Sequence, residues 1–197
     1  MPRRGPPTTA RHLDQSAQHQ ASLTQGLGSR RRALLRASPP HEGDGDGYSW
    51  ALPQDRTDAI SDAQVAALGN SVAQSFLAWL DVVPAFRSVG VLGASQGACI
   101  ALQALRAAPR RFAYAVNVSG YCLPGTEAGD RELRSRRPDV FWGRGRFDEV
   151  IPTDYVNRTA DWLPRHSTLT ERIYDIGHDI CEAELDDIAD FVSARVH

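Results

Sequence analysis

The chain has 197 residues, of which 42% are hydrophobic and 23% are charged, and its formal net charge at pH 7 is −2. This length is enough for one sizeable hydrophobic core, and the composition is that of an ordinary globular domain. The low net charge gives no reason to expect nucleic acid or a membrane surface as a partner of the whole molecule. No apolar run reaches the roughly 18 residues that a membrane span needs, so we expect no membrane span.

The first 32 residues differ from the rest of the chain in composition. They are rich in Gln, Ser, Thr, Arg and Pro and show neither helical nor strand periodicity. We therefore predict that residues 1–32 are a disordered basic segment, and that residues 33–197 form one α/β domain. An arginine-rich, acid-poor segment is also typical of a transit peptide or of an arm that binds nucleic acid, and these two interpretations stay open.

The predicted elements begin with a strand-like run at Ala33–Ala37, followed by a Gly- and Asp-rich loop over His41–Gly47. Farther along, Ser61-x-x-Gln64 has the pattern of a capping box, in which two side chains satisfy the first amides of a helix. Apolar residues at helical spacing follow it until Pro84. The pattern predicts a long amphipathic helix that ends before this proline.

The most informative stretch lies around Ser95, where a short apolar run ends at Gly93 and a helical pattern begins after Gly97. A serine at so sharp a strand-to-helix turn needs small neighbours, because a Cβ on either side would keep the strand and the helix apart. The backbone N–H of Gln96 belongs to the first turn of the predicted helix, where developing negative charge is favoured. The stretch predicts a nucleophile elbow with Ser95 as the nucleophile. The alternative is an ordinary Gly-rich turn with an inert serine.

Strands and helices alternate in the rest of the chain. Phe112–Ser119 predicts one strand, and residues 122–138 form a long polar connection that we interpret as a cap or lid segment. Asp139–Gly143 and Thr168–Ile176 predict two more strands, and a closing helix follows from Cys181 onward. Because the strands are largely apolar and therefore covered on both faces, the pattern predicts a three-layer α/β sandwich around a mostly parallel sheet.

The three cysteines, Cys99, Cys122 and Cys181, are an odd number and lack the close pairing of a metal site. Reduced thiols and a cytoplasmic location are the corresponding expectation. Cys99 and Cys181 lie on predicted apolar helix faces, so we expect both in the core.

A serine hydroxyl needs an imidazole to take its proton and a carboxylate to orient that imidazole. Among six histidines, only His178 lies just past the end of a predicted strand, after Gly177, and Asp148 follows another strand by a few residues. The carboxyl ends of parallel strands share one edge of a sheet, so we expect Ser95, Asp148 and His178 to meet there. Glu149 and Asp154 are rival candidates for the orienting acid.

A metal site is the alternative for His178, because Glu182 follows it one helical turn later. This pair lacks a third ligand, so we expect no metal. A capping histidine without catalytic function is a further alternative.

Three segments carry a resemblance to a known family: Gly93-Ala94-Ser95-Gln96-Gly97, Gly145-x-x-Asp148-x-Val150-Ile151-Pro152 and Tyr174-x-x-Gly177-His178. They resemble the phospholipase/carboxylesterase family of α/β-hydrolases, which includes acyl-protein thioesterases and small bacterial carboxylesterases. The resemblance runs from about Ala33 to the C-terminus and implies an α/β-hydrolase domain over residues 33–197. It also implies carboxylic esters or thioesters as substrates, no cofactor, and an oxyanion or substrate-binding place for Gln96 and Trp50.

The chain departs from the family pattern in one respect, because no His-Gly pair occurs in it. In the family, a His-Gly-x-Gly loop ends the strand beside the elbow strand and supplies half of the oxyanion hole. We therefore expect an N-terminally incomplete hydrolase, with a gap in the sheet between the Ala33–Arg36 run and the elbow strand. An open apolar edge of this kind favours self-association or a homodimer.

These patterns favour a serine hydrolase that cleaves small-molecule esters or thioesters through an acyl-enzyme and does not bind nucleic acid. The alternative is a catalytically weak or silent remnant that binds acyl ligands or a protein partner. A nucleic-acid-binding module that uses the basic N-terminal segment is a third and less favoured hypothesis.

Overall fold

The computed structural model of the protein describes residues 41–42, 48–49, 60–82 and 88–195. Strand β1 (His41–Glu42) pairs antiparallel with strand β2 (Tyr48–Ser49). The predicted loop over His41–Gly47 is therefore wrong at its first two residues, which belong to β1. The predicted strand at Ala33–Ala37 and the segment 1–32 lie outside the described residues.

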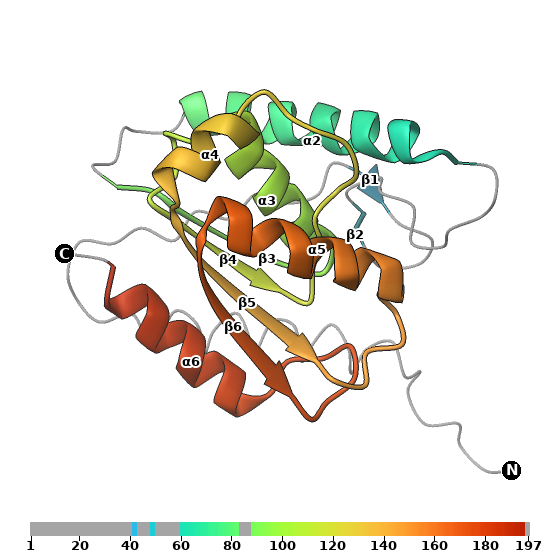
Figure 1. Cartoon of the computed structure of the whole chain (residues 1–197), viewed down its shortest axis with the longest axis vertical. Coiled ribbons are helices and arrows are strands. Elements are labelled where there is room, and N and C mark those ends of the chain that lie inside the picture. The colour runs from blue at the N-terminus through green and yellow to red at the C-terminus, as the bar shows by residue number, and fades with distance from the viewer. Residues whose placement is uncertain (1–40, 43–47, 50–59, 83–87, 196–197) are drawn as a thin grey trace, which may run out of the picture.

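The main sheet consists of four parallel strands in the order β3-β4-β5-β6 (Figure 1). The strands are β3 (Gly90–Ala94), β4 (Tyr114–Val118), β5 (Asp139–Gly145) and β6 (Thr168–Tyr174). The helices are α2 (Asp62–Val82), α3 (Gln96–Ala107), α4 (Asp130–Arg136), α5 (Thr153–His166) and α6 (Glu182–Ser193). Parallel neighbours need crossovers, and α3, α4 and α5 lie in these crossovers. The predicted α/β class with a parallel sheet is confirmed.

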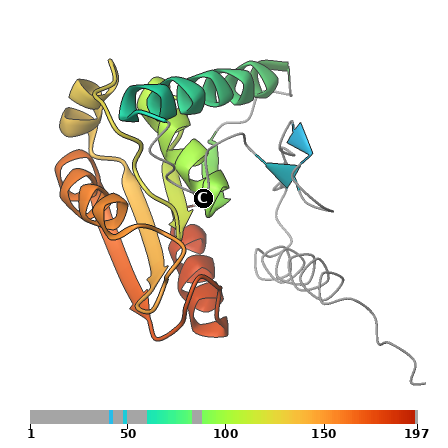
Figure 2. The ribbon, with the colours of Figure 1, turned by 90° about the vertical axis from the view of Figure 1, so that its right-hand side faces the viewer.

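Helices cover both faces of this sheet, with α2, α3, α4 and α5 on one side and α6 on the other (Figures 1 and 2). Alternate residues of β5 point to opposite faces. Trp142 packs in the cluster that includes residues of α2, α3 and α5, whereas Phe141 packs with Ile188 and Phe191 of α6. All four side chains are at least nine-tenths buried. The predicted three layers are therefore present, with one of these two clusters on each face of the sheet.

The predicted capping box begins α2. The Ser61 amide donates to Gln64 Oε1 at 2.9 Å, and the Gln64 amide donates to Ser61 Oγ at 3.3 Å. The buried residues Val65, Val72 and Leu80 lie along one side of this helix. The prediction of a long amphipathic helix from residue 61 onward is thus confirmed.

The connection over residues 122–138 is more ordered than the sequence predicted, because it contains α4. Arg106 of α3 is fully buried and donates to both carboxylate oxygens of Asp130 at 2.9 Å. The same guanidinium donates to the carbonyls of Leu123 at 3.0 Å and Gly125 at 2.7 Å. Burial acts to raise the pKa of Asp130, but the hydrogen bonds from Arg106 and from the Glu127 amide, together with the positive charge of Arg106, outweigh it, so the pKa is lowered. This connection is fastened to α3, and α4 packs on α5.

Strand β3 is the outermost strand of the four on its side. The backbone groups of its odd-numbered residues face β4. The Ser95 amide continues this row of hydrogen bonds by donating to the Val118 carbonyl at 2.8 Å. The amides and carbonyls of Gly90, Leu92 and Ala94 therefore point away from β4. Leu92 is 44% exposed, and within the described residues no strand pairs with this edge. The gap that the sequence predicts beside the elbow strand would lie at this edge of β3.

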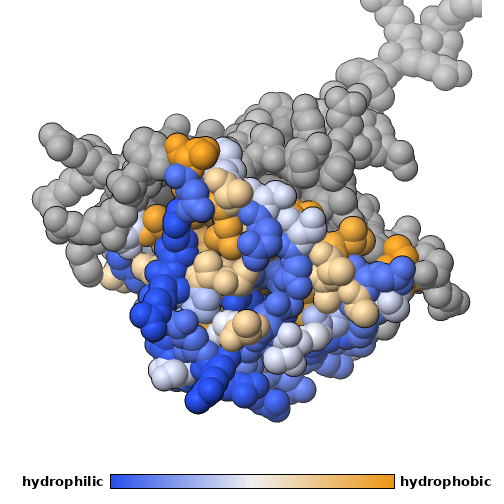
Figure 3. Space-filling view, turned by 90° about the horizontal axis from the view of Figure 1, so that it is seen from above, coloured by the Kyte–Doolittle hydropathy of each residue, from blue (hydrophilic) through white to orange (hydrophobic). Residues whose placement is uncertain are grey.

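The surface on the side of α2 is mostly hydrophilic, with separate apolar patches (Figure 3). Leu68 and Val82 are the large apolar residues that α2 exposes. None of the helices in the described part of the chain is both long and apolar enough to cross a membrane.

All three cysteines are free thiols. Cys99 and Cys122 are buried, and burial raises the pKa of each thiol to about 12. Cys181 is only half-buried and is the residue before α6, so its predicted core position on a helix face is wrong. A protonated, buried thiol is a poor nucleophile, so Cys99 and Cys122 contribute packing rather than chemistry.

Candidate active site

The turn at Ser95 has the geometry that the sequence predicted for an elbow. The φ and ψ angles of Ser95 are 51° and −122°, a region that non-glycine residues rarely adopt. A Cβ on Gly93 would lie 2.2 Å from the carbonyl oxygen of Gly97, so β3 and α3 approach as closely as they do only because residue 93 is glycine. The Ser95 carbonyl accepts the amide of Ala98 at 3.0 Å, which begins α3 directly behind the hydroxyl.

The imidazole of His178 lies between the two other side chains of the predicted constellation. Its Nε2 is 2.9 Å from Ser95 Oγ, and its Nδ1 is 2.8 Å from Asp148 Oδ2. With the proton on Nδ1, the ring donates to the carboxylate and accepts from the serine hydroxyl. The structure thus brings Ser95, His178 and Asp148 into one continuous hydrogen-bonded row.

The loop between β5 and α5 holds the Asp148 carboxylate in place. Its Oδ1 accepts the amides of Val150 at 2.9 Å and Ile151 at 3.1 Å, which leaves Oδ2 for the imidazole. The Asp148 side chain is 8% exposed and that of His178 is 22% exposed. The rival acid Glu149 is exposed. Asp148 is therefore the acid that the fold presents to His178.

A close contact joins the loop of Asp148 to the loop of His178. The Phe147 amide donates to the Ile176 carbonyl at 2.9 Å, and a Cβ on Gly145 would lie 2.1 Å from the Gly177 carbonyl oxygen. The distance between the acid and the imidazole is therefore set by contacts between the ends of adjacent strands.

Asp154, the other rival acid, is the second residue of α5 and is exposed.

The sequence also predicted Gln96 and Trp50 as oxyanion or substrate-binding residues. Gln96 is the first residue of α3 and is half-buried beside Ser95, so its amide belongs to the first turn of that helix. Trp50 lies outside the described residues. Two apolar side chains next to Asp148 are strongly exposed, Phe147 at 61% and Val150 at 55%.

A second strained turn follows β4 and was missed by sequence reasoning. Ser119 has a φ of 49° and is buried, and the Gly120 amide donates to Asn117 Oδ1 at 2.8 Å. A Cβ on Gly120 would lie 3.1 Å from the Ser95 carbonyl oxygen and 2.3 Å from the Ala98 Cβ. The turn thus packs directly behind the nucleophile. The sequence signal was slight, since Ser119-Gly120 reads only as the end of a strand.

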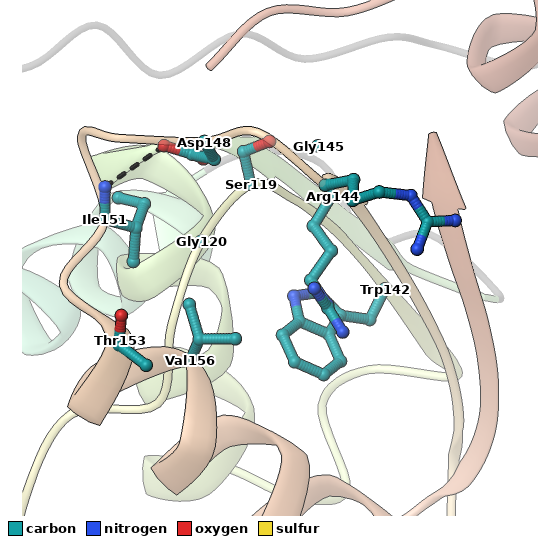
Figure 4. A pocket seen from close by; sticks show the side chains of 10 residues that line it. Ser119, Gly120, Trp142, Arg144, Gly145, Asp148, Ile151, Thr153 and Val156 are labelled. Carbon is teal, nitrogen blue, oxygen red and sulfur yellow. Dashed lines mark hydrogen bonds between the residues drawn. The ribbon is translucent and has the colours of Figure 1, made fainter. Parts of the chain in front are cut away.

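A cavity of about 190 Å³ opens next to Asp148 (Figure 4). It is lined by residues from the ends of β4 and β5, from the Asp148 loop and from the start of α5: Ser119, Gly120, Trp142, Arg144, Gly145, Arg146, Asp148, Ile151, Thr153 and Val156. Of the hydrogen-bonded row, only Asp148 reaches it.

The metal alternative for His178 finds no support in this geometry. Both ring nitrogens of His178 are engaged, one with Ser95 and one with Asp148. In the described part of the chain, no group of three His, Cys, Asp or Glu residues is arranged to hold a metal ion.

Comparisons with known proteins point in one direction. The family model described as Phospholipase/Carboxylesterase matches residues 53–196. Among solved structures, SOBER1 of Arabidopsis thaliana is 18% identical with a TM-score of 0.66, and the match covers 92% of this chain and 93% of that one. Acyl-protein thioesterase 2 of Zea mays is 21% identical with a TM-score of 0.57, with 72% and 69% of the two chains covered.

The carboxylesterase of Bacillus cereus is 14% identical with a TM-score of 0.53, and the match covers 72% of this chain and 66% of that one. No curated protein matches the chain. At these identities the solved structures show the fold, whereas the family model covers most of the sequence. The chain therefore belongs to the phospholipase/carboxylesterase family and has the fold of an α/β-hydrolase.

Proposed function

We propose that the protein hydrolyses carboxylic esters or thioesters through an acyl-enzyme on Ser95. The observation that carries this proposal is the row Ser95–His178–Asp148, with hydrogen bonds of 2.9 and 2.8 Å. In a serine hydrolase the same three residue types act together as nucleophile, general base and orienting acid. The position of Ser95 on a strained elbow supports this assignment.

The first half of the reaction forms the acyl-enzyme. Ser95 Oγ attacks the acyl carbonyl carbon while His178 Nε2 takes the hydroxyl proton, and Asp148 stabilises the imidazolium that results. His178 then gives the proton to the departing alcohol or thiol as the bond between it and the acyl carbon breaks. In the second half, water attacks the acyl-enzyme with His178 again as the base, and the carboxylic acid leaves.

The tetrahedral intermediate carries negative charge on the former carbonyl oxygen, and the proposal assigns its stabilisation to the backbone amide of Gln96 in the first turn of α3. A complete oxyanion hole uses two donors; in the family the second comes from a His-Gly-x-Gly loop, and no His-Gly pair occurs in this sequence. Loss of one donor costs a factor of roughly 10² to 10³ in turnover, so we expect slow hydrolysis. Trp50 remains a candidate for substrate binding.

The test is labelling with a fluorophosphonate, which forms a covalent bond with an activated serine whatever the natural substrate. We expect labelling and hydrolysis of short p-nitrophenyl esters by the full chain, and loss of both in Ser95→Ala. Ser167→Ala is a matched control, because Ser167 is also buried and its hydroxyl donates to the Leu163 carbonyl at 2.7 Å rather than to a histidine. Full esterase activity in Ser95→Ala would refute the assignment of the nucleophile.

A catalytically silent protein that binds acyl ligands or a partner is the second candidate, favoured by the exposed edge at Leu92. It predicts no labelling of Ser95 in a folded protein. Because no strand among the described residues pairs with this edge of β3, self-association is part of the proposal. A cytoplasmic location is also part of the proposal, and the three free thiols support it, because thiols stay reduced in that compartment.

A further inference from the structure

A buried thiol joins the elbow at Ser95 to the strained turn that follows β4. Cys99 lies on α3, one helical turn after Ser95, and is fully buried. Its thiol donates to the Ser95 carbonyl, with 3.4 Å between Sγ and the oxygen, and accepts the Tyr121 amide, with 3.4 Å between the nitrogen and Sγ. These two hydrogen bonds connect the backbone of the proposed nucleophile to a segment that follows a different strand.

The protonation state of this thiol allows both hydrogen bonds. Burial raises the pKa of Cys99 to about 12, so the thiol keeps its proton at neutral pH. An S–H group can donate, and the sulfur can accept. Donation to the Ser95 carbonyl and acceptance from the Tyr121 amide therefore use both capacities of one side chain.

The turn on the far side of the sulfur is itself held in place. The Ser119 amide donates to the Gly143 carbonyl at 2.8 Å, and the Gly120 amide donates to Asn117 Oδ1 at 2.8 Å. Asn117 is fully buried. These bonds fix the turn to strands β4 and β5, so the Tyr121 amide is a fixed point for the thiol.

The strain at Ser95 gives this connection its importance. A residue with φ and ψ of 51° and −122° keeps them only when the surrounding contacts hold it there. The Ser95 carbonyl, whose direction ψ sets, accepts the amides of Ala98 at 3.0 Å and Cys99 at 3.2 Å as well as the thiol. The two amides belong to α3, whereas the thiol also bonds to the turn after β4.

We infer that Cys99 is a positioning residue for the nucleophile. Its two hydrogen bonds hold the Ser95 backbone against the turn after β4, and this keeps Ser95 Oγ in line with His178 Nε2. The inference rests on the proposed hydrolase function, because that function makes Ser95 the nucleophile. Cys99 takes no part in the chemistry itself, since a buried, protonated thiol is a poor nucleophile.

The test compares Cys99→Ser with Cys99→Ala in the full chain. Both variants lose the sulfur, but the serine hydroxyl can accept the Tyr121 amide and can donate to the carbonyl four residues earlier, a common bond within helices. We expect Cys99→Ala to lower kcat for a p-nitrophenyl ester roughly tenfold with KM unchanged, the effect of one buried amide left without its partner. Cys99→Ser should restore most of this loss.

A role in packing alone predicts the opposite order of the two variants. A buried cysteine then acts as a small apolar residue, so the apolar alanine is tolerated at least as well as the polar serine. A kcat of Cys99→Ala equal to or above that of Cys99→Ser would therefore overturn the inference.

Cys122 provides the matched control. Its thiol is also buried, and burial likewise raises its pKa to about 12, but its Sγ donates to the Leu123 carbonyl at 3.6 Å. Cys122→Ser and Cys122→Ala should leave kcat nearly unchanged. Equal losses at Cys99 and Cys122 would show that any change to a buried thiol disturbs the core, and the inference would be wrong.

A measurement that needs no hydrolysis separates this inference from the hydrolase proposal. In protein labelled with ¹⁵N-histidine, the Nε2 signal of His178 reports the hydrogen bond to Ser95 Oγ, and His178→Ala assigns that signal by its loss. We expect the signal in Cys99→Ala to move toward its position in Ser95→Ala, and the signal in Cys99→Ser to stay near that of the unchanged chain. If the unchanged chain neither labels with a fluorophosphonate nor hydrolyses esters, the hydrolase proposal fails, and this signal still decides whether Cys99 positions Ser95. An unmoved signal in Cys99→Ala would overturn the inference at any level of activity.

Discussion

The missing Cβ of Gly93 would lie 2.2 Å from the carbonyl oxygen of Gly97, well inside van der Waals contact. The obstacle is backbone, which cannot move aside as a flexible side chain can. The crossing of β3 and α3 at Ser95 therefore depends on one hydrogen atom in place of a methyl group.

We expect Gly93→Ala to lower the melting temperature strongly and to abolish fluorophosphonate labelling, because the elbow must open to admit the methyl group. Thermal unfolding followed by circular dichroism measures the loss. Gly177→Ala is the matched control for stability, since its Cβ would have its nearest contact at 3.7 Å, from the Phe147 carbonyl oxygen. Equal stability of both variants would show that β3 and α3 can separate at little cost.

Asp148→Asn should lower turnover by roughly 10³- to 10⁴-fold while ester binding changes little. The amides of Val150 and Ile151 require an oxygen at the Oδ1 position, so the new NH₂ group would point at His178 Nδ1. This donor selects the tautomer with its proton on Nε2, which cannot accept from Ser95. Steady-state kinetics of Asp148→Asn and Glu149→Gln separate the two acids, and a larger loss in Glu149→Gln would transfer the role.

Ser95 and His178 should behave as one unit in a double-mutant cycle. If the imidazole acts only by activating the Ser95 hydroxyl, its removal has no further effect once that hydroxyl is gone. Residual rates of Ser95→Ala, His178→Ala and the double variant are the measurement. Losses that multiply would mean that His178 acts elsewhere in the reaction.

Glu184 should make the free energy of unfolding depend on pH. It is fully buried, and neither of its oxygens has a hydrogen-bond partner in the described chain. Burial, with the neighbouring carboxylates of Asp187 and Asp179, raises its pKa from 4.5 to about 7. The folded protein therefore binds more protons than the unfolded chain between these values, and stability falls as pH rises through this window.

Glu184→Gln removes this titration. We expect it to stabilise the protein at pH 8, by at most ~3 kcal/mol for a shift of this size, and to change little at pH 4. Denaturant unfolding at the two pH values is the measurement. Glu182→Gln, at an exposed site two residues earlier on α6, is the control. A gain at pH 8 that is no larger than the gain at pH 4 would contradict the pH dependence.

The buried ion pair of Arg106 and Asp130 should be costly to break. Asp130→Ala leaves the guanidinium unpaired in the interior, and loss of one partner of such a pair costs about 3 to 5 kcal/mol. The Arg110–Glu132 pair on the surface is the comparison, because the Arg110 side chain is 85% exposed. Denaturant unfolding should show a much smaller loss for Glu132→Ala, and equal losses would argue against the special role of burial.

The edge of β3 that faces away from β4, with which no strand of residues 60–82 or 88–195 pairs, should promote self-association. Leu92→Glu places a charge on this edge, a common way to block edge-to-edge pairing. We expect the variant to be more monomeric in analytical ultracentrifugation. Leu68→Glu, at a site 39% exposed on α2, should not change the association state.

Whether residues 1–32 supply a further strand can be tested separately. Rapid amide hydrogen exchange throughout them would agree with a disordered segment, and strong protection of a continuous run would show that they supply a strand. Neither result depends on the activity of Ser95.

The elements that the sequence determined are those governed by neighbouring residues. The capping box at Ser61, the apolar run into Gly93, and the helix after Gly97 follow from local spacing, and all three are present in the structure. The order of Ser95, Asp148 and His178 along the chain, each beyond a strand, was enough to expect them at one edge of a parallel sheet.

Tertiary structure decided everything that depends on distance through space. Spacing along the chain could not choose between Asp148 and Glu149, because adjacent residues share the same loop, whereas the amides of Val150 and Ile151 select one carboxylate. The pairing of Arg106 with Asp130 across 24 residues was equally invisible, as was the cavity around Trp142. A hydrophobic pattern reports which face of an element is covered, but only packing determines which polar groups it leaves without a partner.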